Sequence, residues 1–290
     1  MKIRFILNPK SGTRAVNQDV LKQQILARFP DAELCLTTGP GHATELAHKA
    51  AAQHIDAVVA MGGDGTINET AKGLVHTQTA LGIIPRGSGN GFARELGMMG
   101  TLEQALGKLQ HAAIQPCDIG FANGELFLNL AGVGIEAAVA WQFMEHGKKG
   151  SRGMLPYFKL AAQTFFSYKP NVLRVSINGK THRWAPLTLV FANNRQYGSN
   201  FIIAPQAGIS DGKLEMVIVQ PVAKYKLALA VPFFFLGNKP PFGITATAPV
   251  QSVVIESDQE ILYHIDGEPR KTARHLEITM TPQALRLLVP

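Results

Sequence analysis

A glycine-rich stretch, Gly62-Gly63-Asp64-Gly65-Thr66, constrains the fold of this chain more than any other feature. The apolar residues 57–61 precede it, and apolar residues at helical spacing follow it from Ile67 onward. The stretch therefore predicts a strand, a tight turn and a helix. Glycines let the backbone approach a ligand closely, and the backbone N–H groups at a helix start favour an anion such as phosphate. Asp64 would repel phosphate, so it suggests a metal ion or a proton-transfer role, unless it only caps the helix.

Strands and helices alternate along the first third of the chain. Apolar runs predict strands at residues 3–7, 34–37, 57–61 and 81–84, and helical spacing predicts helices at residues 16–29, 43–53, 67–74, 91–96 and 102–109. Such alternation predicts parallel βα units, whose ligands bind at the carboxyl ends of the strands. Residues 8–12 and 85–91 form two further polar loops with glycine after predicted strands. We expect these loops and the glycine stretch to meet at one edge of the sheet and form a phosphate site of nucleotide size.

The pattern changes near Pro116, where short strands and hairpin signals replace the alternation. Asn123-Gly124 separates predicted strands 118–122 and 125–130, and Asn178-Gly179 separates 172–177 and 180–184. Two helices are predicted at residues 135–146 and 155–167, and further strands at 187–192, 214–219, 250–256, 260–265 and 276–280. From residue 118 onward the sequence therefore predicts a largely antiparallel β domain.

Composition limits the classes of function. The chain has 290 residues, of which 46% are hydrophobic, and is long enough for two cores. Its formal net charge of +7 suits an anionic partner, but the cations are scattered, which argues against nucleic acid. Cys35 and Cys117 show neither metal-ligand spacing nor a disulfide framework, which fits a reducing cytoplasm. No stretch reaches the ~18 apolar residues of a spanning helix, so we expect any membrane contact to be peripheral.

Five motifs together resemble one family. They are Asn8-Pro9-Lys10-Ser11-Gly12, residues 62–69, residues 85–94, Ser210-Asp211-Gly212-Lys213-Leu214 and Asp266-Gly267-Glu268. In this order and spacing they resemble the catalytic domain of diacylglycerol kinases, sphingosine kinases and related bacterial lipid kinases. The resemblance implies a Rossmann-like α/β domain, of the kind found in NAD kinases and phosphofructokinases, that binds ATP. It implies an antiparallel β-sandwich as second domain, which contributes the lipid site. We place the ATP-binding domain at 1–117 together with 281–290, and the lipid-substrate domain at 118–280.

The resemblance also implies roles for individual residues. Asp266 matches the proposed general base, Glu268 is its neighbour, and Asp64 would act through magnesium or beside the catalytic acid. Asp211 matches an aspartate that holds a structural magnesium ion with the backbone carbonyls of Gly208 and Lys213. The residues expected to bind ATP are Asn8, Ser11, Thr37, Gly62, Gly63, Asp64, Gly65, Thr66, Ile67, Asn68 and Ser88.

Several of these features have simpler explanations. Asp266-Gly267 and Asp211-Gly212 are common hairpin turn pairs. The run from Val231 to Leu236 is suited to an acyl pocket, to a bilayer surface or to an ordinary core. The basic loop from Lys148 to Arg152 would touch anionic headgroups or remain solvated.

The resemblance therefore implies an ATP- and magnesium-dependent lipid kinase, and we expect it to convert diacylglycerol to phosphatidic acid in phospholipid biosynthesis. Gly91 stands where many relatives have aspartate, and the Gly-Ser-Gly-Asn run before it is similar to sphingosine kinase-like members, so a sphingosine-type acceptor stays open. A kinase of a soluble substrate such as NAD and a nucleotide-binding regulatory protein also stay open. We expect a cytoplasmic enzyme that is peripheral at the inner face of the membrane, with a homodimer left open.

Overall fold

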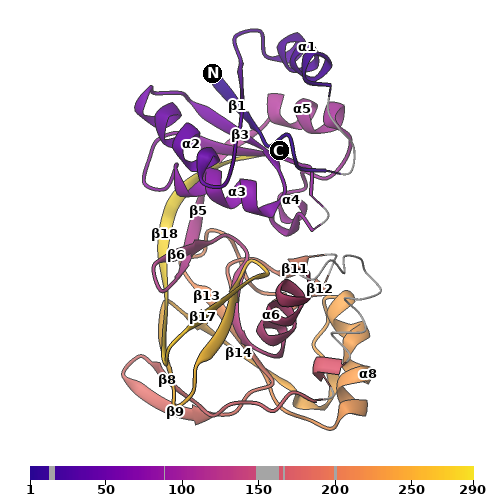
Figure 1. Cartoon of the computed structure of the whole chain (residues 1–290), viewed down its shortest axis with the longest axis vertical. Coiled ribbons are helices and arrows are strands. Elements are labelled where there is room, and N and C mark those ends of the chain that lie inside the picture. The colour runs from indigo at the N-terminus through magenta and orange to yellow at the C-terminus, as the bar shows by residue number, and fades with distance from the viewer. Residues whose placement is uncertain (13–16, 88, 148–162, 166, 199–200) are drawn as a thin grey trace. The chain divides into compact units, whose positions relative to one another are not determined.

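The computed structural model describes residues 1–12, 17–87, 89–147, 163–165, 167–198 and 201–290. The chain forms two compact units: Met1–Ile119 together with Thr281–Pro290, and Gly120–Met280 (Figure 1). The first segment of this first unit ends at Ile119, two residues beyond the boundary at 117 that the sequence predicts. Two strands, β5 (Ala113–Ala122) and β18 (His275–Val289), contribute residues to both units.

The first unit contains a parallel sheet. Its strands are β1 (Ile3–Leu7), β2 (Glu33–Leu36), β3 (Ala57–Gly62) and β4 (Ala80–Pro85), in the order β2-β1-β3-β4, with the end of β18 next to β4. The helices of this unit are α1 (Gln18–Arg28), α2 (His42–Ala52), α3 (Asp64–Lys72), α4 (Gly91–Glu95) and α5 (Leu102–Gln110). Every residue of β1 and β3 is buried, as expected for central strands of a parallel sheet. The predicted alternation is confirmed.

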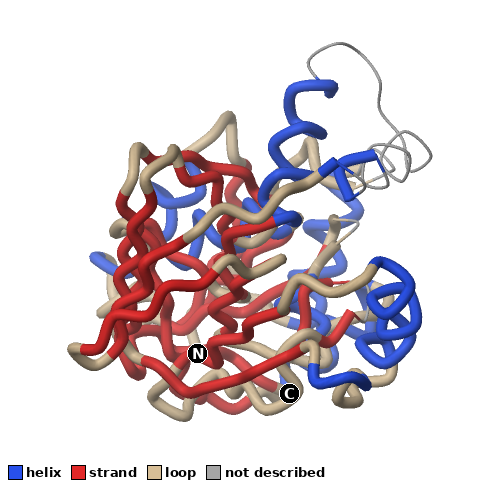
Figure 2. Tube along the Cα trace, turned by 90° about the horizontal axis from the view of Figure 1, so that it is seen from below, coloured by secondary structure: helices blue, strands red, loops and turns tan. Residues whose placement is uncertain are grey.

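The sheets of the second unit are built from antiparallel strand pairs, and Figure 2 shows the strands of the chain in red. A six-stranded sheet has the order β14-β13-β10-β7-β16-β17: β14 (Thr245–Val250), β13 (Leu214–Val219), β10 (Thr188–Ala192), β7 (Leu130–Gly134), β16 (Ile261–Ile265) and β17 (Glu268–Thr272). A second set pairs β15 (Ser252–Ser257) with β8 (Leu173–Ile177) and the start of β18, and β8 with β9 (Lys180–Trp184). One apolar core contains Phe191 and Met216 of the first sheet and Val253 and Ile278 of the second. The predicted sandwich is therefore confirmed.

Among the described residues, the remaining elements of the second unit are three short strands, two helices and a 3₁₀ turn. They are β6 (Glu125–Phe127), α6 (Ile135–Gly147), β11 (Gln196–Gly198), β12 (Phe201–Ile202), α8 (Lys224–Phe235) and a 3₁₀ turn, Pro241–Gly243. The predicted helix at 155–167 lies largely outside the described residues; within it, residues 163–165 and 167 are helical.

Two predicted hairpins are confirmed. Asn123 and Gly124 join β5 to β6, and Asn178 and Gly179 join β8 to β9. All four residues have positive φ, as a two-residue hairpin turn requires.

Two predicted strands are each divided between two strands in the structure. The predicted strand 125–130 is divided after Phe127, because the N–H groups of Leu128 and Asn129 bind the side chain of Asp266, and Leu130 already begins β7. The predicted strand 250–256 is divided at Gln251, where β14 ends and β15 begins.

Candidate active site

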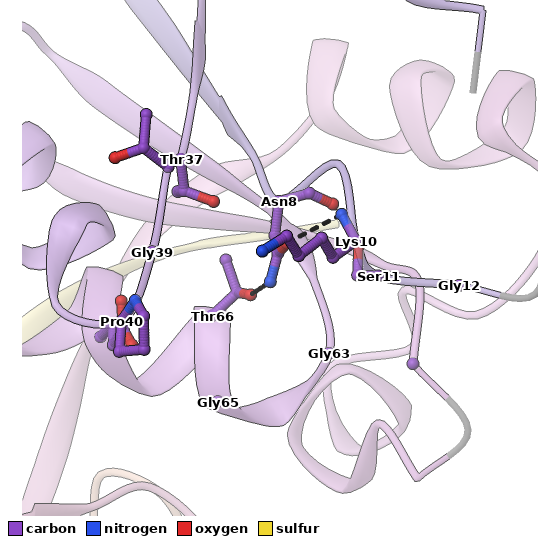
Figure 3. A pocket seen from close by; sticks show the side chains of 13 residues that line it. Asn8, Lys10, Ser11, Gly12, Thr37, Gly39, Pro40, Gly63, Gly65 and Thr66 are labelled. Carbon is purple, nitrogen blue, oxygen red and sulfur yellow. Dashed lines mark hydrogen bonds between the residues drawn. The ribbon is translucent and has the colours of Figure 1, made fainter. Parts of the chain in front are cut away.

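A pocket of about 490 Å³ lies at the carboxyl ends of the parallel strands of the first unit (Figure 3). It is formed by three loops, which follow β1, β2 and β4, and by the start of α3. The residues that line it are Asn8, Lys10, Ser11, Gly12, Thr37, Thr38, Gly39, Pro40, Gly63, Gly65, Thr66, Glu69 and Gly87. The expected meeting of the polar loops at one edge of the sheet is confirmed.

The loop after β1 is fixed by Asn8. Its backbone N–H donates to the carbonyl of Met61 at 3.0 Å, and its side-chain amide donates to Thr66 Oγ1 at 3.1 Å (Figure 3). Asn8 Oδ1 accepts the backbone N–H of Lys10 at 3.0 Å, and its carbonyl accepts the Ser11 hydroxyl at 2.7 Å. Asn8 therefore joins the ends of β1 and β3 and holds Lys10 and Ser11 at the pocket.

The glycine stretch forms the start of α3, with Gly63 as the N-cap. A Cβ on Gly62 would lie 2.4 Å from both Cβ and Oγ1 of Thr66, and a Cβ on Gly87 would lie 2.8 Å from the Cα of Gly63. The close approach of these backbone segments therefore depends on glycine. The N-terminus of α3 faces the pocket through Gly63, Gly65 and Thr66, where backbone N–H groups favour an anion.

Asp64 lies in the first turn of α3 but does not line the pocket. Its Oδ2 accepts the backbone N–H of Asn90 at 2.9 Å. Asn90, with φ of 49°, is the N-cap of α4, and its side chain binds both the N–H and the carbonyl of Gly87. Asp64 thus joins the glycine turn to the glycine loop after β4.

The residues expected to bind ATP divide into three groups. Asn8, Ser11, Thr37, Gly63, Gly65 and Thr66 line the pocket. Four others lie in or beside the glycine turn but do not line the pocket: Gly62, Asp64, Ile67 and Asn68. The Ile67 side chain is buried in the core. Ser88 lies outside the described residues.

Sequence reasoning assigned no role to Lys10, although this residue supplies a cation to the pocket. The signal was present, because Lys10 is the basic residue of the Asn-Pro-Lys-Ser-Gly run.

Asp266 lies in the second unit, in the turn between β16 and β17. Its carboxylate accepts three backbone N–H groups: Oδ2 from Leu128 at 3.0 Å, and Oδ1 from Asn129 at 2.8 Å and Leu130 at 2.9 Å. The φ of Asp266 is 48° and that of Gly267 is 85°, so this pair is also a hairpin turn. The turn fixes the position and orientation of the carboxylate.

Arg270 holds Glu268, the neighbour of Asp266 in the motif. Arg270 donates to both carboxylate oxygens of Glu125, at 3.0 and 2.7 Å, and to Glu268 Oε2 at 3.1 Å. The hydrogen bonds to Glu125, the largest cause, raise the pKa of Arg270 above its ordinary value. A charged guanidinium at this position orients Glu268 beside the turn.

A buried polar cluster lies behind the Asp266 turn. His264 accepts the N–H of Gly267 at Nδ1, at 3.4 Å, and its Nε2 contacts the hydroxyl of Tyr197. Glu136 Oε1 lies 3.9 Å from the same nitrogen. Burial lowers the pKa of His264 to about 3, and burial raises the pKa of Glu136 to about 8. Tyr197 and Glu136 belong to no motif, so this cluster has no signal in the sequence.

The predicted structural magnesium site corresponds to the loop before β13. A Cβ on Gly208 would lie 3.2 Å from Asp211 Oδ2, so the loop brings these two residues together. The side chain of Lys213 lies 3.7 Å from Asp211 Oδ2. A carboxylate with backbone carbonyls is the hard oxygen donor set that Mg²⁺ prefers, and here Lys213 also offers Asp211 a cation. Among the described residues, no group of three or more His, Cys, Asp or Glu side chains could hold a metal ion.

No helix within the described ranges is long and apolar enough to span a membrane.

Comparisons with known proteins identify the family. Residues 2–122 match the family described as "Diacylglycerol kinase catalytic domain", and residues 130–289 match the "YegS C-terminal NAD kinase beta sandwich-like domain". A diacylglycerol kinase of Bacillus subtilis is 30% identical, over 76% of this chain and 74% of its own. The chain belongs to the diacylglycerol kinase and YegS-like lipid kinase family. It is therefore a phosphotransferase of the kinase class, and the resemblance found in the sequence is confirmed.

Three further proteins match nearly the whole length of this lipid kinase. A Pseudomonas putida protein named "Probable lipid kinase YegS-like" is 31% identical over 96% of this chain and 93% of its own. The crystal structure of a diacylglycerol kinase from Bacillus anthracis has a TM-score of 0.76 at 21% identity, covering 100% of this chain and 97% of that one. An NAD kinase from Archaeoglobus fulgidus, solved in complex with ATP, has a TM-score of 0.55 at 14% identity, covering 99% and 93%. The fold is thus common to lipid and NAD kinases.

Proposed function

We propose that this lipid kinase transfers the γ-phosphoryl group of ATP to a lipid hydroxyl, and that its acceptor is diacylglycerol, which it converts to phosphatidic acid. The observation that carries the proposal is the pocket of about 490 Å³ at the N-terminus of α3. Glycine backbone, the hydroxyl of Thr66 and the cation of Lys10 surround it. The ATP complex of the NAD kinase with the same fold supports ATP as the donor.

The first unit would bind and neutralise the phosphates. Backbone N–H groups at the start of α3 and the Lys10 ammonium favour the triphosphate, and Asn8 keeps both in place. Phosphoryl transfer needs mainly positioning and charge neutralisation, which a preformed pocket supplies. Mg²⁺ would supply further neutralisation of the phosphate charge, with Asp64 as the nearby carboxylate and Asp211 as the residue that would hold a structural ion.

Asp266 would remove the proton of the attacking hydroxyl. Its carboxylate is held by three backbone donors, so it needs no reorganisation before it accepts a proton. Glu268, oriented by its hydrogen bond from Arg270, would be the second carboxylate beside the turn that carries Asp266.

The identity of the acceptor is the most specific part of the proposal. The name of the Bacillus subtilis relative supports diacylglycerol. A sphingosine-type acceptor remains the alternative on account of Gly91, and a soluble acceptor such as NAD on account of the shared fold. We place the enzyme in the cytoplasm, peripheral at the inner face of the membrane, because a diacylglycerol acceptor resides in the bilayer.

Transfer of labelled γ-phosphate tests the proposal. The protein is incubated with labelled ATP and magnesium, in parallel with a mixed lipid extract, with sphingosine and with NAD. Labelled phosphatidic acid is the expected product. If only sphingosine or only NAD is labelled, that molecule takes the place of diacylglycerol as the proposed acceptor. ATP binding without any labelled product would favour a regulatory protein.

A further inference from the structure

Exposed apolar side chains gather on α8 and the turn that follows it. Six of the ten large apolar side chains that are exposed in the described part of the chain lie between residues 225 and 242. We call them the α8 patch: Tyr225, Leu229, Val231, Phe235, Leu236 and Phe242, which are 64, 57, 40, 51, 70 and 55% exposed. Such a concentration on one segment marks an interaction surface.

The helix is apolar on both sides. Its inner side is packed: Ala230 and Phe234 are buried in the core of the second unit, and the Phe234 ring stacks on Phe201 with centroids 5.0 Å apart. Its outer side carries exposed residues at positions 225, 229, 232 and 236, which recur at helical spacing. An apolar inner side explains the packing of α8, and the apolar outer side is typical of a surface that meets a partner.

The charged residues of the segment that carries the patch are of one sign. Lys224, Lys226 and Lys239 lie within it or next to it, and the sequence contains no acidic residue between Glu215 and Glu256. Lys226 Nζ lies 5.6 Å from the ring centroid of Phe242. Glu215 itself is only 7% exposed, so it contributes little negative charge to the surface. Lysines beside exposed aromatic and leucine side chains are typical of a surface that lies at a bilayer with anionic lipids.

We propose that the α8 patch docks this lipid kinase on the membrane, with its apolar side chains among the acyl chains and its lysines at anionic headgroups. The proposal rests on the proposed function only in that the acceptor is a membrane lipid. A second copy of the chain is the less suitable occupant, because a two-fold interface through this face would bring two sets of lysines together.

Co-sedimentation with vesicles tests the surface without measuring catalysis. Wild type and the double variant Leu229→Glu/Leu236→Glu are mixed with vesicles of phosphatidylcholine alone or with phosphatidylglycerol. Burial of two leucines predicts that the double variant binds mixed vesicles at least about tenfold more weakly. Lys226→Glu is expected to weaken binding to mixed vesicles by at least about fivefold and to remove much of its salt dependence. The matched control is Val20→Glu, an exposed apolar residue on α1 that is 49% exposed.

Folding and oligomeric state are followed in the same samples. If the double variant loses its melting transition, Tyr225→Glu takes its place, since this side chain is 64% exposed and the start of a helix favours an acidic residue. The docking surface is contradicted if wild type does not bind mixed vesicles, if the double variant binds them as wild type does, or if Val20→Glu is equally impaired. Conversion of a dimer to a monomer with unchanged vesicle binding would assign the face to a second copy instead.

Activity on a water-soluble short-chain acceptor separates this proposal from the proposed function. The double variant should phosphorylate such an acceptor at the wild-type rate while binding vesicles weakly. If wild type phosphorylates no lipid and the double variant still loses vesicle binding, the docking surface is supported. The assignment of a lipid acceptor to the kinase is then wrong.

Discussion

Asp64 Oδ2 accepts the backbone N–H of Asn90 at 2.9 Å, which ties the start of α3 to the glycine loop after β4. Asp64→Asn keeps an oxygen that can accept this N–H, whereas Asp64→Ala does not. We expect Asp64→Ala to lower the free energy of unfolding by ~1–3 kcal/mol and Asp64→Asn to leave it nearly unchanged. Urea unfolding of both variants measures this difference. Equal stability of the two variants would show that the contact is not structural.

The same two variants distinguish the structural contact of Asp64 from the role of its negative charge. If the negative charge of Asp64 serves magnesium or the catalytic acid, Asp64→Asn should lower turnover by on the order of tenfold or more in a protein of normal stability. Wild-type turnover in Asp64→Asn would restrict Asp64 to its contact with Asn90.

Gly62 should not tolerate a side chain. A Cβ there would lie 2.4 Å from Thr66 Cβ, so the start of α3 would have to move and the hydrogen bond between Asn8 and Thr66 would be lost. We expect Gly62→Ala to lower the free energy of unfolding by ~1–3 kcal/mol and to abolish measurable ATP binding. Thermal melting checks the first effect. Gly39→Ala is the matched control, because it also lines the pocket and no atom lies within 4 Å of its added Cβ. Equal melting temperatures of the two variants would refute the steric argument.

Lys10 should contribute to ATP affinity. Its loop is fixed by Asn8, and its exposed ammonium lies at the pocket, so Lys10→Met should raise the dissociation constant for ATP by about tenfold. The effect should shrink at high salt, since exposed charges are screened. Calorimetric titration at two salt concentrations measures both. Lys22→Met on α1 should bind ATP as wild type does, and a Lys10→Met variant that behaves in the same way would remove Lys10 from the site.

The buried Glu136 predicts a dependence of stability on pH. Burial raises the pKa of this carboxyl from 4.5 to about 8, while the nearby Thr188 hydroxyl acts in the opposite direction. The folded protein therefore holds this proton more tightly than the unfolded chain, and stability falls as pH rises from 4.5 to about 8. Burial lowers the pKa of His264 from 6.5 to about 3, so its contribution is lost as pH falls below 6.5.

The two effects oppose each other between pH 4.5 and 6.5, so the window from 6.5 to about 8 isolates Glu136. There the free energy of unfolding should fall by up to ~1.4 kcal/mol per pH unit. Urea unfolding at both ends of the window measures the slope, and Glu136→Gln should flatten it. The same slope in wild type and Glu136→Gln would contradict a raised pKa.

Local pattern was sufficient to predict the first unit. The buried strands are continuous apolar runs, and the glycine loops follow them directly, so both the parallel sheet and the edge that carries the pocket follow from the sequence. The sequence did not show which distant residues contact each other. Leu128 and Asn129 lie within a predicted strand, but their N–H groups bind Asp266, more than 130 residues away, and they belong to no strand.

The second unit was less predictable, for two physical reasons. The segment from Lys224 to Phe235 has apolar residues at every position after Lys226 and contains Pro232, so its sequence does not show the one-sided apolar pattern from which a helix could be inferred, yet it forms α8. A strand was expected only at residues 276–280, whereas β18 continues past Pro282 to Val289. The chain stays one strand through Pro282, with Gln283 at φ of 51°, pairing with β15 before it and with β4 after it.

The most direct test of the account is the turnover of Asp266→Asn beside wild type, in transfer of labelled γ-phosphate from ATP to diacylglycerol. The substituted amide would retain an oxygen for the backbone donors of Asn129 and Leu130 but could not accept a proton. We expect turnover to fall by on the order of 10²-fold or more while the dissociation constant for ATP stays nearly unchanged. The control Asp258→Asn replaces an exposed aspartate of the same unit, which pairs with Arg174, and should keep wild-type turnover. Turnover of Asp266→Asn close to that of wild type, in a protein that binds ATP normally, would contradict the role of Asp266 as general base.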